Sequence, residues 1–197
     1  MGPATDTVAR ERDLNSLAVL TVVVVLATVT MTFGAMIAAF LIRSQSPLLW
    51  RHILLPRVLW LTTAILLASS ITFEAARSRL RHNDQREFFR LTAWTTALGL
   101  LFLAGQIAAG VQILNTGVFL VRNPHFWFIF LFTGLHALHI LIGLGGLAYL
   151  LVRTREPASG PKYQMKTRVI ANGISIFWHY LDFLWIVLFT LLLTWRR

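Results

Sequence analysis

The stretch that decides the fold runs from Phe126 to Leu151 and reads FWFIFLFTGLHALHILIGLGGLAYLL. Its 26 residues include no Asp, Glu, Lys or Arg. At a helical rise of about 1.5 Å per residue, it is long enough to cross a hydrocarbon core about 30 Å thick. His136 and His139 lie near its middle, three residues apart and therefore on one side of a helix. Titratable groups are costly at membrane depth, so these histidines predict a face turned toward protein, water or a polar ligand.

The composition of the whole chain indicates an integral membrane protein. Of its 197 residues, 56% are hydrophobic and 13% are charged, and the mean hydropathy is +0.67. The net charge of +10 comes from Lys and Arg that lie between apolar runs, which favours contact with anionic lipid over binding to nucleic acid. The absence of Cys excludes disulfides, thiolate metal sites and Cys nucleophiles. The polar first 16 residues lack a signal-peptide layout, so we expect no cleaved leader.

Five apolar runs have the length of a membrane span. They cover about residues 16–42, 54–76, 91–114, 126–151 and 170–195. In lipid each backbone N–H and C=O needs a partner inside its own segment, so we expect five transmembrane helices. The connections are too short for a separate soluble domain. The sequence therefore predicts an all-α polytopic protein with a single membrane domain over residues 1–197.

The positive charges predict the orientation of these helices. With five spans, 12 of the 18 Lys and Arg residues fall on the side of the N-terminus and 6 on the other. We therefore expect a cytoplasmic N-terminus and a C-terminus outside the cell.

Two groups of polar residues interrupt the apolar runs. The fifth run carries Trp178, His179 and Asp182, of which the last two are three residues apart and can touch. An Asp near a helix centre costs roughly 3 kcal/mol on insertion scales, so it needs a proton, a partner or water. The residues alone leave two interpretations open, a proton relay or polar-ligand site and a hydrogen-bonded clamp between helices.

Glu74 ends the second run shortly before Arg77 and Arg81, and we expect its carboxylate to pair with these arginines. His136 and His139 could in principle hold haem or a metal ion. A redox centre needs further histidines on facing helices, and only His179 remains at helix depth. We therefore assign no catalytic, cofactor-binding or metal-binding residue to this chain.

Four segments resemble subunit III of the haem–copper cytochrome oxidases. Residues 124–143, PHFWFIFLFTGLHALHILIG, resemble the family's TGxHxxHxxxG helix, and residues 177–185, FWHYLDFLW, resemble its final YWHFxDxxW helix. Residues 55–70, LPRVLWLTTAILLASS, and residues 99–106, GLLFLAGQ, are similar to two intervening helices. The segments occur in the family's order, and five helices fit its shorter bacterial form.

The resemblance implies a non-catalytic accessory subunit in aerobic electron transport. Such a subunit packs beside subunit I, together with subunit II and other respiratory subunits. It binds phospholipid, supports proton uptake and stabilises the complex in a bacterial inner membrane. Haem and copper would lie in the partner subunits. Polar residues of this chain that match the family's motifs would line a lipid-binding or structural polar seam. The seam comprises His136, His139, His179, Asp182 and Trp178.

The sequence also departs from the family's pattern. Many members carry an acid in the first of these helices, where this chain has Thr28 and Val29. Many also carry an acid shortly after the glutamine that aligns with Gln106, where this chain has none. The resemblance therefore does not imply a carboxylate-based proton role for the first helix.

Two other functions remain as alternatives. One is a subunit III-like protein of a nitric oxide reductase or a quinol oxidase, because such relatives share these motifs. The other is a free-standing small transporter that uses Asp182 and the histidine pair, although no run has the central Pro of a broken helix.

Overall fold

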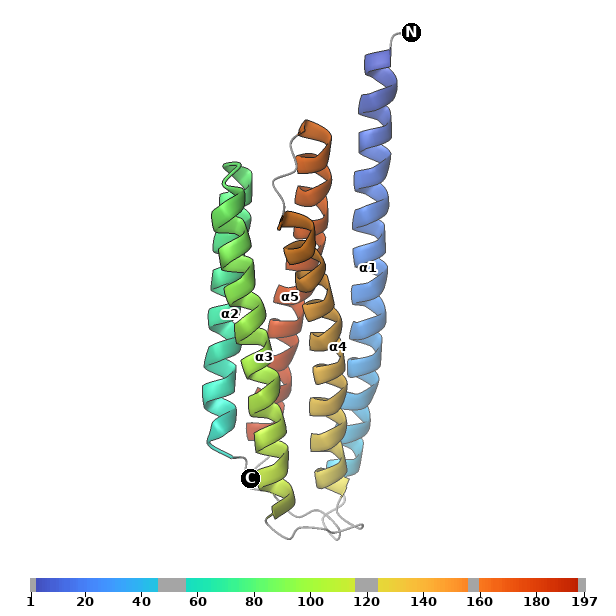
Figure 1. Cartoon of the computed structure of the whole chain (residues 1–197). Coiled ribbons are helices and arrows are strands. Elements are labelled where there is room, and N and C mark those ends of the chain that lie inside the picture. The colour runs from blue at the N-terminus through green and yellow to red at the C-terminus, as the bar shows by residue number, and fades with distance from the viewer. Residues whose placement is uncertain (1–2, 46–55, 116–123, 156–159, 195–197) are drawn as a thin grey trace.

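The computed structural model describes residues 3–45, 56–115, 124–155 and 160–194. These residues form five α-helices and no strand within the described ranges (Figure 1). All five are long and apolar enough to cross a membrane, which confirms the predicted all-α fold class. The helices are α1 (Pro3–Ser44), α2 (Val58–Arg81), α3 (Gln85–Asn115), α4 (Pro124–Thr154) and α5 (Pro161–Thr194).

Several helices extend past the apolar runs because hydrogen bonding along a helix does not stop where the lipid ends. The first helical residue of α5 is Pro161, at the position where a missing N–H is harmless. The carboxylate of Asp84 accepts a hydrogen bond from the N–H of Glu87 at 3.2 Å and so begins α3 at Gln85. Asn83 adopts φ 61°, a left-handed conformation that lets α2 turn directly into α3.

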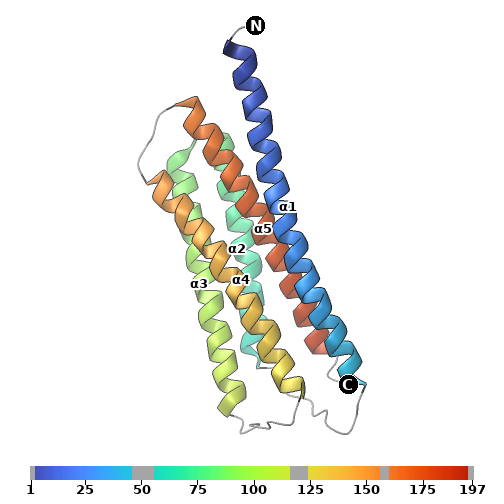
Figure 2. The same ribbon diagram turned by 90° about the vertical axis from the view of Figure 1, so that its right-hand side faces the viewer.

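The helices run roughly along one axis, with α1 on the opposite side of the bundle from α2 and α3 (Figures 1 and 2). The pair α2 and α3 forms a hairpin, α4 packs on α3, and α5 contacts α2, α4 and α1. The N-terminal part of α1 projects beyond the other helices in both views. Helices α5 and α4 therefore connect α1 to the rest of the bundle.

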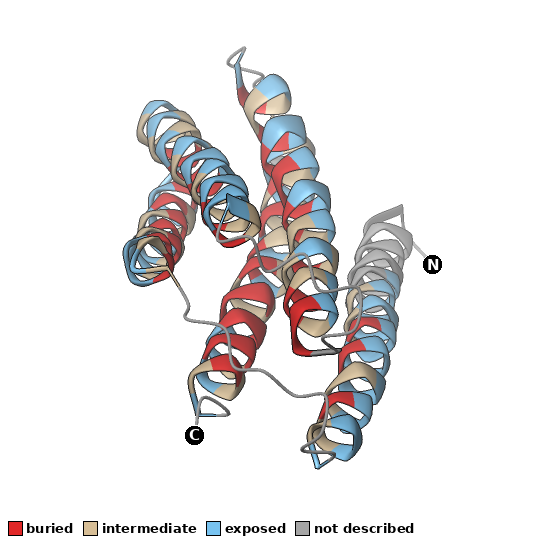
Figure 3. Ribbon diagram, turned by 90° about the horizontal axis from the view of Figure 1, so that it is seen from below, coloured by how far each residue is buried: buried red, intermediate tan, exposed pale blue. Residues whose placement is uncertain are grey.

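Buried residues lie on the facing sides of the helices (Figure 3). One apolar cluster lies among α2, α3, α4 and α5 and includes Phe73, Phe102, Trp178 and Trp185. A second lies between α1, α4 and α5 and includes Phe33, Phe40 and Phe132. The outward faces remain apolar, as expected of helices that meet lipid tails.

The centre of the first cluster is the fully buried indole of Trp178. A Cβ added at Gly99 of α3 would lie 2.9 Å from the Trp178 ring and 2.9 Å from Leu144. A Cβ added at Gly143 of α4 would lie 3.0 Å from the opposite edge of the same ring. The two glycines therefore create the space that the indole fills, which is how small residues allow membrane helices to approach closely.

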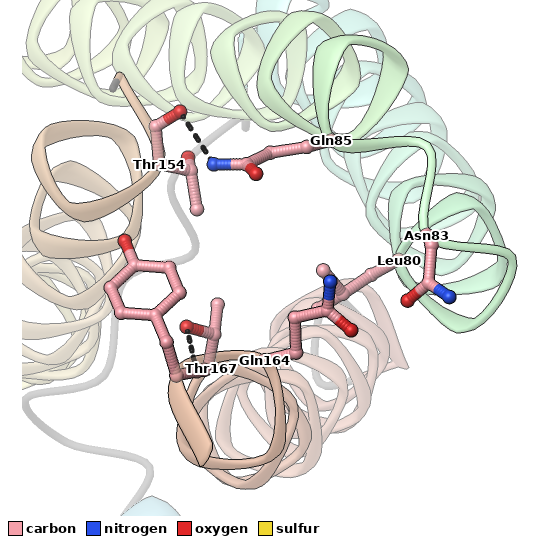
Figure 4. Close-up of a pocket in the computed structure, with 7 residues that line it drawn as sticks. Leu80, Asn83, Gln85, Thr154, Gln164 and Thr167 are labelled. Atoms are coloured by element: carbon pink, nitrogen blue, oxygen red, sulfur yellow. Dashed lines mark hydrogen bonds between the residues drawn. The ribbon is translucent and has the colours of Figure 1, made fainter. Parts of the chain in front are cut away.

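Side chains of α3 and α5 satisfy the last backbone carbonyls of α4. Gln85 Nε2 donates to the Thr154 carbonyl at 3.3 Å, and the hydroxyl of Tyr163 donates to the Arg153 carbonyl. Such terminal carbonyls have no partner within their own helix. These contacts surround a polar cavity of about 20 Å³, room for about one water molecule, between the α2–α3 turn and the α4–α5 end (Figure 4).

Candidate functional site

The most extensive polar contact between helices joins α2 to α5. We call it the α2–α5 polar line, and it comprises Ser70, Glu74 and Arg77 of α2 with Ser175, His179 and Asp182 of α5. Each set has spacings of four and three residues, so each forms a stripe on one face of its helix. The two stripes pair in opposite order because the helices are antiparallel.

The inner part of the line centres on Ser70. Its hydroxyl donates to Oδ2 of Asp182, and its oxygen lies 2.8 Å from Nδ1 of His179. A hydroxyl has one proton, and Ser70 donates it to Asp182. The Ser70 oxygen must therefore accept a hydrogen bond from Nδ1–H of His179. Asp182 is only 5% exposed, and its Oδ1 has no hydrogen-bond partner among the described residues. The serine thus supplies the partner that a buried carboxyl requires.

The outer part of the line reaches the surface of the chain. Nε2 of His179 lies 3.6 Å from Oε2 of Glu74, and Arg77 Nη1 donates to the same Oε2 at 2.8 Å. The same Nη1 lies 3.0 Å from Oγ of Ser175. The side chain of Glu74 is 50% exposed and that of His179 is 39% exposed. The line therefore runs from an outward face of the bundle to the buried Asp182.

Two tryptophans of α5 hydrogen-bond to hydroxyls of α2 beside this line. Trp178 Nε1 donates to Ser69 Oγ at 3.1 Å, and Trp185 Nε1 donates to Thr63 Oγ1 at 3.0 Å. Buried indole N–H groups need such acceptors. Trp178 therefore lies next to the polar line, on the buried side of α2.

The histidines of α4 lie elsewhere and face two different helices. His136 is fully buried, stacks on Trp185 at 5.0 Å between ring centroids and meets Phe102 edge-on at 6.0 Å. Neither of its ring nitrogens has a hydrogen-bond partner among the described residues. Nδ1 of His139 donates to the Leu135 carbonyl at 2.7 Å, and its ring lies 5.6 Å from that of Phe33 in α1.

The structure therefore does not bring the five seam residues together. His179 and Asp182 face α2, whereas His136 contacts the neighbouring Trp185 and His139 faces α1. The physical reason is the helical repeat, because 3.6 residues per turn separates positions three apart by about 60° around the axis. In a bundle this angle is enough to direct two side chains toward different neighbours.

Of the three charged residues at the end of α2, Glu74 and Arg77 form an ion pair. The backbone carbonyl of Arg81 accepts a hydrogen bond from Nη2 of Arg168 at 3.2 Å. The same nitrogen donates to Asn83 Oδ1 at 2.9 Å, so Arg168 holds the α2–α3 turn against α5.

A cleft lies between α1, α4 and α5, and none of the five residues expected to line a lipid-binding seam borders it. Its volume is about 260 Å³ and its walls are almost entirely apolar. Gly143 and Gly146 of α4 and Gly173 of α5 line it, and these positions without a side chain were the available signal. The remaining lining residues are Thr21, Val22, Val25, Ile142, Ile174 and Phe177.

Contacts farther along α1 close one end of this cleft. The hydroxyls of Thr30 and Tyr180 lie 2.6 Å apart. One turn beyond Thr30, the ring of Phe33 contacts the ring of His139. About two turns farther along α1, Phe40 meets Phe132 edge-on at 5.7 Å between ring centroids. Helix α1 is thus attached to the bundle from Thr30 onward. It also touches α5 at the cleft, where a Cβ added at Gly173 would lie 3.3 Å from Cγ2 of Val22.

No three His, Asp or Glu side chains of the described residues converge as a metal-binding group. His136 and His139 instead contact aromatic rings and a backbone carbonyl.

The family model for "Cytochrome c oxidase subunit III" matches residues 19–197. A protein of Synechocystis sp. named cytochrome c oxidase subunit 3 is 30% identical over 71% of this chain and 56% of its own length. A protein of Thermostichus vulcanus with the same name is 28% identical over 88% of this chain and 85% of its own length. A probable cytochrome c oxidase subunit 3 of Mycobacterium bovis is 31% identical, with 66% of this chain and 62% of the relative covered. For two of these three, the matched part is less than two thirds of the relative.

Proposed function

Because this chain belongs to the cytochrome c oxidase subunit III family, we propose that it is a non-catalytic accessory subunit of a haem–copper terminal oxidase. In this role it packs beside subunit I within a complex that also contains subunit II. Haem and copper belong to those partner subunits, and electron transfer to O₂ takes place there. The observation that carries the proposal is the family match over residues 19–197, which includes the four spans that resemble the family in sequence and the better part of α1.

The cleft between α1, α4 and α5 supports binding of a phospholipid. Its walls of Val, Ile, Phe and Gly suit an acyl chain, whose only favourable contacts are apolar. The Thr30–Tyr180 contact lies along α1 beyond the lining residues Thr21, Val22 and Val25. In our proposal an acyl chain lies along this apolar wall and fills the gap between α1 and α5.

The α2–α5 polar line supports a structural role in the complex. Hydrogen bonds between membrane helices average about 0.6 kcal/mol each, and the line combines several of them over about two helical turns. We propose that the subunit supports proton uptake by keeping this bundle and its lipid in place beside subunit I. Residues 28 and 29 of α1 are Thr and Val, so this proposal gives α1 no proton-carrying acid.

We further propose the orientation and location that the charges favour. The N-terminus lies in the cytoplasm and the C-terminus outside, in the plasma membrane of a bacterium. Five membrane-spanning helices make the chain a multi-pass membrane protein, and the relatives named above are bacterial. Accessibility of tags at the two ends tests the orientation, and a cytoplasmic C-terminal tag would contradict it.

Purification in a mild detergent through a tag on this chain tests the assembly. We expect haem-bearing subunits to co-purify, with a haem a spectrum, cytochrome c oxidation and bound phospholipid. A complex without haem a that reduces nitric oxide or oxidises quinol would favour the related enzymes. A colourless protein that transports a solute by itself would refute the accessory role.

A further inference from the structure

The bundle has ionisable side chains on an outward face at membrane depth. Arg168 of α5 touches the Arg81 carbonyl at the end of α2, which marks a common level. At 1.5 Å per residue, Glu74 lies about 10 Å and His179 about 16 Å along their helices from that level. Both side chains are nevertheless partly exposed, at 50% for Glu74 and 39% for His179. Lipid tails offer such groups no hydrogen bond, so polar groups at this depth normally face protein.

The same face of α5 carries an exposed row of side chains that has the spacing of a helix-packing seam. We call it the outer stripe of α5. Its members follow one another at intervals of four, three, four, three and four residues, which is the heptad spacing of a helix-packing seam. They are Asn172, Ile176, His179, Phe183, Ile186 and Thr190, all exposed or half-exposed.

Helix α5 contacts both α1 and α2, so these two helices flank the outer stripe. Ile71 of α2 is 72% exposed and lies one residue from Ser70, the residue that joins α2 to His179. Phe183 is 63% exposed on the next turn of α5. Exposed apolar side chains of α2 and α5 therefore lie near the half-exposed Glu74 and His179, which form a polar centre between them.

Resting on the proposed function, we propose that a transmembrane helix of a partner oxidase subunit packs on the outer stripe of α5 and places a hydrogen-bond donor opposite Glu74. Every contact of Glu74 with described residues uses Oε2, so Oε1 can accept from that donor. A carboxylate oxygen selects an N–H or O–H group, such as Arg, Lys, Ser or Thr. The polar centre would then fix the register of the two helices, and Ile71 and Phe183 would supply the apolar contact.

The chain has no Cys, so single cysteines report directly on this surface. Phe183→Cys places a thiol on the outer stripe, and Leu101→Cys places one on α3, where Leu101 is 52% exposed. Counted from the same level, the two positions lie about 22 and 24 Å along their helices, which makes Leu101→Cys a control matched for depth. A lipid-soluble maleimide is applied to the intact complex and to the same sample unfolded in SDS.

We expect Phe183→Cys to react several-fold more slowly in the complex than Leu101→Cys, and both to react equally after unfolding. Equal reaction in the complex would show that the stripe faces lipid and would overturn the inference. A disulfide-linked pair of this chain through Phe183→Cys would assign the stripe to a second copy and overturn it as well. If the wild-type chain retains no haem-bearing subunits, the proposed function itself fails, which is a separate result.

Glu74→Gln tests the polar centre that Glu74 of α2 forms with His179 beside the outer stripe of α5. This substitution keeps the shape of the side chain and removes its charge, so we expect several-fold less haem to co-purify in stringent detergent. The control is Glu87→Gln, because Glu87 forms a similar ion pair with Arg90 at 2.9 Å at the start of α3. Equal haem recovery with the two variants would contradict the placement of a donor opposite Glu74.

Discussion

The contact between Gly105 of α3 and Thr62 of α2 gives the sharpest test of the packing. A Cβ added at Gly105 would lie 2.2 Å from Cγ2 of Thr62, whereas carbon atoms pack at about 3.5–4.0 Å. Either the methyl group or one of the two helices must therefore move by roughly 1.3 Å in the variant Gly105→Ala.

Thr62 cannot relieve this clash by rotating its side chain without losing hydrogen bonds. Its Oγ1 donates to the Leu59 carbonyl at 3.0 Å and accepts from Nε2 of Gln106 at 3.3 Å. Overpacking a core costs about 1–3 kcal/mol, and the better helix propensity of Ala returns up to about 1 kcal/mol. We expect Gly105→Ala to lower the free energy of unfolding by about 1 kcal/mol.

A double-mutant cycle separates this clash from other effects of the substitution. Thr62→Ser keeps the hydroxyl and removes the obstructing methyl group, at a cost of about 0.8 kcal/mol for the lost apolar contact. In the double variant the new methyl of Ala fills the space that Cγ2 leaves. We therefore expect a stability close to that of the wild type and a favourable coupling energy of about 2 kcal/mol.

Equilibrium unfolding in mixed detergent micelles, followed by circular dichroism, measures these differences. Gly145→Ala is the control, since a Cβ there would meet nothing within 4 Å. If Gly105→Ala is as stable as this control, or if the two substitutions are additive within about 0.5 kcal/mol, the described α2–α3 contact is wrong.

Two further predictions concern the polar line and the cleft. Ser70→Ala removes the hydroxyl that joins His179 to the buried Asp182, so we expect it to lower unfolding stability by about 1–3 kcal/mol in the same assay; an unchanged stability would contradict the bridge. Val25→Trp fills the cleft with an indole, whereas its neighbour Val24 lies outside the cleft lining. We therefore expect less phospholipid phosphorus per purified complex with Val25→Trp than with Val24→Trp, and equal lipid content would argue against an acyl chain there.

The sequence predicted the five spans because each is a long run with at most two charged residues. In a membrane such a run must form a helix, since its backbone groups need partners within the segment. The sequence also identified His179 and Asp182 of the polar line on α5, but not Ser175. It could not identify their neighbour, because spacing along one helix gives the direction of a side chain and not the helix that it meets. The partners of His179 and Asp182 proved to be Ser70 and Glu74. Ser70 carried no signal in the sequence, and Glu74 was expected only to pair with arginines.

The histidines of α4 show the same limit. Their spacing indicated a shared face, and the fold divides that face between two neighbours. The resemblance implied bound phospholipid and placed it at the polar seam. The apolar cleft is lined instead by Gly143 and Gly173, and Gly143 also packs against Trp178. Spacing along α4 and α5 does not show where α1 leaves space beside them.

The two ends of the apolar part of α1 therefore differ in how they pack against the other helices. Only 11% of the apolar window of α1 is buried by the chain itself, against 44% for α5. From Thr30 onward α1 is held by a hydroxyl contact and by the rings of Phe33 and Phe40. Toward Thr21 it borders the cleft and meets α5 through Val22, whose Cγ2 would lie 3.3 Å from a Cβ added at Gly173. A lipid in the cleft would thus act as a structural component, because it would supply the packing that side chains supply elsewhere in the bundle.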